Sequence, residues 1–170
     1  MKFSNPLKIA MLSALLGFVV VGLTPTSAVA QANPATTTFN VTATVLKDCI
    51  VSATALPFGN YIGAVVNVSS TVTVTCTNST AYTVGLNQGL TTGATVTTRQ
   101  MGITQPAGGL NYSLLTTSYS GANWGNTSGS WVSGTGNGAA QPLTVYGVLP
   151  AGQYVPPGSY TDTIAVTVTY

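Results

Sequence analysis

Hydrophobic and polar residues alternate with a period of two near the end of the chain. The apolar positions are Ile164, Val166, Val168 and Tyr170, and the residues between them are Thr or Ala. This period predicts a strand that buries one face. The alternation continues to the last residue, so we expect this strand to need a partner that no later segment supplies.

The same period begins after the stretch QANPATTT, where Phe39, Val41, Ala43 and Val45 alternate with Asn and Thr. It predicts a short, half-buried strand. Further apolar segments predict strands over residues 49–57, 66–76, 82–86, 110–114 and 142–150, whereas residues 120–141 are rich in Gly, Ser and Asn and predict a long surface loop. About seven short strands separated by turns predict an all-β fold, an antiparallel β-sandwich with immunoglobulin-like packing in one domain.

The first 30 residues have the order of a secretory signal peptide. Lys2 and Lys8 precede an apolar run over residues 9–23, and Ala28-Val29-Ala30 supplies the small residues of a cleavage site. The alternative is a membrane anchor, but a spanning helix needs about 20 apolar residues. We therefore expect an exported protein that begins near Gln31 and has no membrane anchor.

Charged side chains are scarce, with four Lys and Arg, two Asp and no His in the sequence. After residue 30 they are Lys47, Asp48, Arg99 and Asp162, and their charges cancel. Nucleic acids and anionic membranes bind clustered Lys and Arg, so we expect neither partner. A net charge near zero is compatible with self-association. Arg99 and Asp162 are candidates for an ion pair across the sheet, the alternative being that each is solvated separately.

The same scarcity excludes most enzyme chemistry. General acid–base catalysis needs titratable groups near the reacting proton, and the Ser and Thr hydroxyls have no base to activate them. We expect neither an enzyme nor a bound cofactor. Cys49 and Cys76 form an even pair in an exported chain, which predicts a disulfide. A metal site is the weaker interpretation, because two Cys without His do not complete a zinc site.

Two further features leave alternatives open. Trp124 and Trp131 could stack on sugar rings as in a lectin, or they could anchor the Gly-rich loop to the sandwich. An unprotected last strand offers unpaired N–H and C=O groups. The strand over residues 39–45 of the same chain, or that of another copy, could pair with it, and periodicity does not separate the two.

The order of several motifs resembles the spore coat U family, which includes the major subunits of archaic, Csu-type chaperone-usher pili. The motifs are TVLKDCIVSATALPFGNY, VTVTCT, RQMGI, LNYSLL, WGN and TVYGVLPAGQYVPPGSYTDTIAVTVTY. Together they cover nearly the whole mature chain. The paired Cys and the closing GSYTDT with VTVTY are the most specific parts.

The resemblance implies an incomplete immunoglobulin-like domain, residues 47–170, that lacks its last strand. A periplasmic chaperone first fills the resulting groove. At an outer-membrane usher, the N-terminal extension of the next subunit, residues 31–46, then replaces the chaperone strand. By this resemblance the donor-strand residues are Phe39, Val41, Ala43 and Val45, and the acceptor-groove edge strand carries Ile164, Val166, Val168 and Tyr170.

The function implied is a structural subunit of a head-to-tail pilus. It would be exported to the periplasm and then assembled at the cell surface, where it would support adhesion and biofilm formation. Two alternatives remain: a secreted spore-coat or matrix protein that folds as a self-complemented monomer, and a lectin-like glycan-binding module.

Overall fold

The computed structural model describes residues 33–103 and 108–170. The predicted signal peptide, residues 1–30, lies outside the described residues. By their contacts, residues 43–170 form a unit of their own, which contains every strand assigned in the described residues. The description below concerns this unit.

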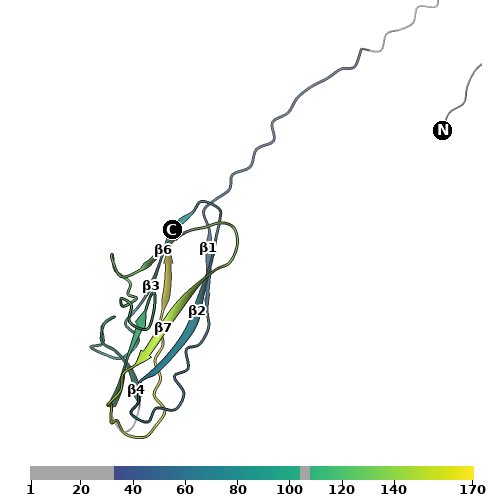
Figure 1. The fold of residues 1–170 in the computed structure, drawn as a ribbon. Helices are drawn as coiled ribbons and strands as arrows, with labels where there is room; N and C mark the ends of the chain where they lie inside the picture. The colour runs from purple at the N-terminus through teal and green to yellow at the C-terminus, as the bar shows by residue number, and fades with distance from the viewer. Residues whose placement is uncertain (1–32, 104–107) are drawn as a thin grey trace, which may run out of the picture. The chain divides into compact units, whose positions relative to one another are not determined.

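The fold is all-β and antiparallel, with two sheets in the described residues. A five-stranded sheet has the order β1-β2-β7-β5-β4, and a three-stranded sheet has the order β6-β3-β8. Figure 1 shows β1, β2 and β7 side by side, as their pairing requires. The strands are β1 (Cys49–Ala53), β2 (Val66–Cys76), β3 (Ala81–Leu86), β4 (Arg99–Ile103), β5 (Gly108–Leu115), β6 (Val132–Thr135), β7 (Gln141–Leu149) and β8 (Val166–Thr169).

The long strands β2 and β7 form the centre of the five-stranded sheet. Val72 and Val74 of β2 face inward and alternate with Thr, and Val145 and Leu149 of β7 are also buried, so each strand buries one face. Their register pairs Val72 with Leu143 and continues from Val66 to Val74. Side chains of β3, β5 and the loop that carries Trp124 complete one core between the two sheets.

The strand predictions hold for the long, strongly alternating segments and fail at four places. No strand is assigned over residues 39–45, where one was predicted. β6 lies inside the segment predicted to be one long loop, and it pairs with β3 from Val84 to Ala81. β1 ends at Ala53 rather than near Pro57, one residue before the last backbone bond to β2, which the Thr54 N–H donates to the Thr71 carbonyl. β8 covers only Val166–Thr169 of the predicted final strand.

Candidate functional site: an apolar groove beside the last strand

Both sheets have an unpaired edge in the region of β1 and β8. Among the strands of the described residues, β8 pairs with β3 alone, and β1 pairs with β2 alone. The other edge of each strand presents N–H and C=O groups that another strand can pair with. β8 carries no Lys, Pro or charged side chain that would discourage such pairing.

A groove with a cavity volume of about 1220 Å³ lies at one end of these edges, where Ala53 ends β1 and Val166 begins β8. Two chain segments border it, which we call the first wall (residues 54–63) and the second wall (residues 153–166). Its floor is made of core side chains from both sheets. The floor residues that the groove reaches include Val72, Leu86, Leu110, Leu114, Val145 and Leu149.

The first wall is hydrogen-bonded only near its two ends. At one end the Thr54 backbone N–H donates to the Thr71 carbonyl at 2.9 Å, and Thr54 Oγ1 accepts from the Thr71 N–H at 3.0 Å. At the other end the Tyr61 hydroxyl donates to the Pro150 carbonyl at 2.6 Å. Residues 55–60 make no hydrogen bond to any other part of the described chain. Their apolar side chains therefore supply the contact with the core.

The second wall is fixed by polar contacts along its length. Thr161 exchanges two backbone hydrogen bonds with Gly102 of β4, at 3.0 and 3.1 Å. Ala165 donates to Asn87 Oδ1 at 2.9 Å and accepts from the Asn87 N–H at 3.1 Å. These contacts attach the wall to both sheets, at the edge of one and at the end of β3 in the other.

Asp162 supplies the second wall with a further set of contacts. Its Oδ1 accepts from the N–H groups of Leu90 at 2.8 Å and Thr163 at 2.7 Å. Its Oδ2 accepts from the Tyr112 hydroxyl at 2.5 Å. Burial, and then the hydrogen bond to Asp162, raise the pKa of Tyr112 well above its usual range, so the phenol stays protonated. The carboxylate thus joins the second wall to β5 and to the loop after β3.

Arg99 was left by the sequence as a candidate either for an ion pair with Asp162 or for separate solvation, and its hydrogen bonds match neither alternative. Arg99 is fully buried, and its guanidinium donates to backbone carbonyls instead. Its Nη2 reaches Leu86 at 3.0 Å and Trp124 at 2.7 Å, and the other bonds go to Asn87 and Val96 at 2.9 Å. Burial lowers the pKa of Arg99, while the nearby Tyr112 and Asp162 act in the opposite direction. Arg99 therefore fixes the end of β3, from which Asn87 holds the second wall.

The four residues predicted to form the acceptor edge divide into two pairs. Ile164 and Val166 line the groove, and both pack against the core. Val168 packs against the core but is not part of the groove lining. Tyr170 is 52% exposed and follows the end of β8. The groove is therefore displaced toward the N-terminal side of the predicted strand and includes the Pro-rich turn before it.

The four predicted donor-strand residues lie in a segment without assigned secondary structure. Residues 33–48 contain no strand. Phe39, Val41 and Val45 are 84%, 83% and 86% exposed, and Ala43 is also exposed. A chain with three large apolar side chains in solvent carries a surface suited to burial against a partner.

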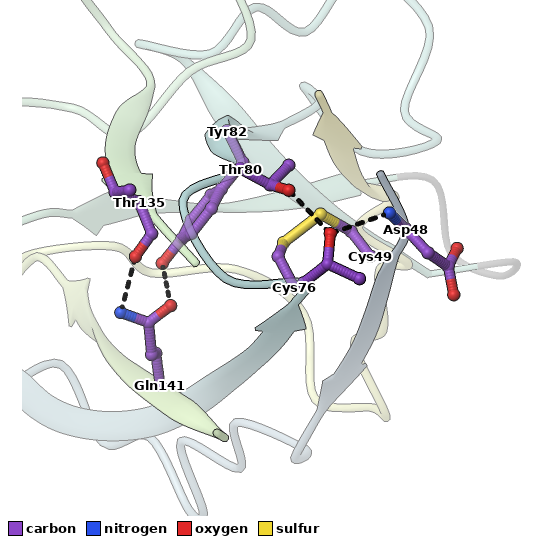
Figure 2. Close-up of a disulfide and its surroundings, with 8 residues drawn as sticks. Asp48, Cys49, Cys76, Thr80, Tyr82, Thr135 and Gln141 are labelled. Atoms are coloured by element: carbon purple, nitrogen blue, oxygen red, sulfur yellow. Dashed lines mark hydrogen bonds between the residues drawn. A yellow bond between two sulfur atoms is a disulfide. The ribbon is translucent and has the colours of Figure 1, made fainter. Parts of the chain in front are cut away.

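The predicted disulfide is present between Cys49 and Cys76. The two residues lie directly opposite each other at the start of β1 and the end of β2 (Figure 2). Beside them, the Thr77 N–H donates to the Asp48 carbonyl at 2.9 Å, and the Asp48 N–H donates to Thr77 Oγ1 at 3.2 Å. The end of residues 33–48 is thereby joined to the longest strand of the fold.

The two tryptophans have different environments. Trp124 is buried, and its Nε1–H donates to the Val84 carbonyl at 2.8 Å, so it anchors its loop to the core. Of the two alternatives that the sequence left open, Trp124 therefore has the role of a loop anchor. Its buried ring is not accessible for stacking on a sugar. Trp131 is 38% exposed.

Sequence patterns did not identify most of the groove. Leu56 and Phe58 of the first wall and Tyr160 of the second wall pack against the core although they belong to turn-rich segments. The available signal was the aromatic and apolar content of LPFGNY and QYVPPGSY, which is unusual for solvent-exposed turns.

The described residues contain no group of three or more His, Cys, Asp or Glu that could hold a metal ion. Within the same residues, no helix is long and apolar enough to cross a membrane.

Comparisons with known proteins agree with this architecture. The family model described as "Spore Coat Protein U domain" matches residues 35–167. Protein U of Myxococcus xanthus is 34% identical over 98% of this chain and 99% of its own length. A chain in the crystal structure of the CsuC–CsuE chaperone–tip adhesion subunit pre-assembly complex, from archaic chaperone-usher Csu pili of Acinetobacter baumannii, is 25% identical with a TM-score of 0.58. That match covers 75% of this chain and 41% of the solved chain. The chain belongs to the spore coat U domain family, a structural family related in fold to Csu pilus subunits.

Proposed function

We propose that the protein is a structural subunit of a cell-surface pilus that assembles by donor-strand exchange. One observation carries the proposal: a large apolar groove reaches the start of β8, a strand with an unpaired edge, in a chain whose residues 39–45 expose alternating apolar side chains. In this proposal the domain is an incomplete immunoglobulin-like sandwich, and residues 31–46 of a neighbouring copy supply the missing strand.

β-Strand addition explains why both features occur together. Backbone hydrogen bonds along the second wall would give affinity, and alternate side chains in the groove would give register. Burying Phe39, Val41, Ala43 and Val45 contributes about 4–10 kcal/mol before the cost of ordering the segment. Because each copy would give its N-terminal segment to the next and accept one in turn, the contact does not close on itself, and a fibre results.

The proposal includes the assembly partners that the resemblance implies. A periplasmic chaperone would cover the groove after export, and an outer-membrane usher would exchange the chaperone strand for the next subunit. Similarity to a chain in a chaperone–subunit complex supports this step. The disulfide supports an oxidising compartment. The fibre would then serve adhesion and biofilm formation.

The test is expression of the full chain and of a variant lacking residues 31–46, each with a pilus chaperone and usher, followed by electron microscopy. We expect fibres from the full chain only. The shortened variant should still be recovered as a folded, chaperone-bound subunit. Fibres of normal length without residues 31–46 would contradict the proposal.

The second candidate is a secreted coat or matrix protein that folds as a self-complemented monomer. The match to Protein U over nearly its whole length favours it. In that case residues 39–45 would fill the groove of their own chain, and removing residues 31–46 would unfold the protein. Sedimentation and circular dichroism of the purified mature protein, with and without these residues, separate the two functions.

A further inference from the structure

On the inward face of β7, the groove does not reach the position between Val145 and Leu149. Val145 and Leu149 line the groove, whereas Gly147, which lies between them on the same face, does not. A Cβ atom on Gly147 would lie 2.7 and 2.9 Å from the two Cδ atoms of Leu56 and 3.1 Å from Cζ of Phe58. The space above Gly147 is therefore occupied by these two side chains of the first wall.

These side chains fix the depth of the groove at this place. The first wall makes no hydrogen bonds over residues 55–60, so packing over Gly147 is what holds it against the core. Phe58 also contacts Tyr112 edge to face, with ring centroids 6.0 Å apart. A residue larger than Gly at position 147 would displace both side chains. The groove is consequently shallow at its middle and deeper over Val145 and Leu149.

The exposed segment of residues 39–45 has a matching order of side-chain sizes. Ala43 is small, and it lies between the larger Val41 and Val45 on the same face of an extended chain. Val41 and Val45 are about 13 Å apart in a strand, as are Val145 and Leu149 of β7. A small side chain between two larger ones fits a floor that is shallow between two deeper places.

We infer that Ala43 of one copy lies against Leu56 and Phe58 of the next copy, above Gly147, with Val41 and Val45 over the deeper floor on either side. The inference rests on the donor-strand exchange proposed above. It assigns a size filter to the first wall, because a donor segment with a large side chain at this position would clash with Leu56 and Phe58. The filter would select which N-terminal segments enter the groove.

Labelled peptides test the filter directly. The mature chain is refolded with fluorescein-labelled peptides of residues 33–48, so that the groove can take a peptide before another copy's segment enters. Fluorescence polarisation then compares the wild-type peptide with Ala43→Leu and with the matched control Val41→Leu. Overpacking predicts that Ala43→Leu weakens binding about tenfold to a hundredfold. Val41→Leu should change it by less than about fourfold, since it adds a single methylene over the deeper floor.

The reciprocal change is made in the acceptor. Leu56→Ala in the mature chain should bind the Ala43→Leu peptide nearly as well as the unaltered chain binds the wild-type peptide. If Leu56→Ala does not fold by circular dichroism, the comparison of peptides on the unaltered chain decides. Equal binding of the wild-type and Ala43→Leu peptides would overturn the size filter alone. Weaker binding of Ala43→Leu that Leu56→Ala leaves unchanged would also overturn it. Failure of the wild-type peptide to bind would instead contradict the donor-strand exchange itself.

Discussion

The two walls of the groove are held in place by different physical interactions. In the second wall, Thr161 and Ala165 are bonded to both sheets through the backbone, and Asp162 adds three hydrogen bonds from its side chain. In the first wall, Leu56 and Phe58 pack on Gly147 and no hydrogen bond is made over residues 55–60. The second wall is held by directional hydrogen bonds, and the first wall is held by apolar packing.

This difference suits the two tasks that an entering strand would set. A strand that adds to a sheet needs a neighbouring backbone in a fixed register, because a shift by one residue turns every side chain to the other face. The fixed second wall meets that need. Side chains that enter a groove need a surface of matching shape, and an apolar wall supplies that shape through its packing. The comparison predicts that disturbing the second wall abolishes stability or assembly. Disturbing the first wall should instead change how well the side chains of an entering strand fit the groove.

Removing the buried guanidinium of Arg99 should have the largest effect. Arg99→Met leaves four backbone carbonyls without their donor, and unsatisfied buried acceptors cost about 1–3 kcal/mol each before relaxation. We expect a loss of about 4–6 kcal/mol in the free energy of unfolding, measured by urea denaturation. Arg99→Lys keeps the charge but not the planar fork and should recover only part of it. Full stability of Arg99→Met would show that the second wall does not depend on the end of β3.

Removing the disulfide comes next. The double change Cys49→Ala and Cys76→Ala opens a loop with a sequence separation of 27 and should cost about 3.5 kcal/mol in the chain-entropy model. Because β1 leads directly into the first wall, hydrogen exchange should increase in β1 and in residues 54–63 more than in residues 153–166. A uniform increase in exchange across both walls would contradict the separate support that the comparison assigns to them.

Truncating the first wall should have a smaller and local effect. Phe58→Ala removes a half-buried ring from above Gly147 and should lower the free energy of unfolding by about 2 kcal/mol, less than for a fully buried Phe. Limited proteolysis should then cleave within residues 55–60, while the second wall remains protected. Tyr154→Ala, at a side chain that is 91% exposed, is the matched control and should change neither measurement.

The second wall and the first wall also differ in how far the sequence predicts them. The period-two pattern identified Ile164 and Val166 beside the groove, because a strand with one buried face has a direct sequence signature. It also extended the strand to Tyr170, since periodicity does not indicate where the ladder of hydrogen bonds ends. The disulfide was predictable from the even number of cysteines in a chain expected to be exported.

The first wall had no such signature. Leu56 and Phe58 flank Pro57 in a segment that reads as a turn, and their role depends on Gly147, which is about 90 positions away in the chain. The same limit explains the error at Arg99. The sequence offered Asp162 or solvent as partners of Arg99, but the fold places backbone carbonyls around the guanidinium. Contacts of this kind depend on tertiary structure, which local patterns do not contain.

The hydrogen bond between Tyr112 and Asp162 gives the smallest effect of the series and a dependence on pH. Tyr112→Phe removes one of the three side-chain bonds of Asp162, at a cost of about 1.5 kcal/mol at neutral pH. The pKa of Tyr112 is raised in the folded protein from its ordinary value of 10.0, mainly by burial, so the folded state keeps a proton that the unfolded state releases above about pH 10. The contribution of Tyr112 is therefore fully present below pH 10 and is lost as the pH rises further.

The wild-type protein should lose stability above pH 10 more steeply than Tyr112→Phe, by up to about 1.4 kcal/mol per pH unit. Urea denaturation from pH 7 to pH 11.5 measures the difference between the two proteins, and Tyr154→Phe provides a control for the exposed phenols. Parallel curves for wild type and Tyr112→Phe would mean that the phenol titrates in the folded protein, and the second wall would then owe less to Asp162 than its contacts indicate.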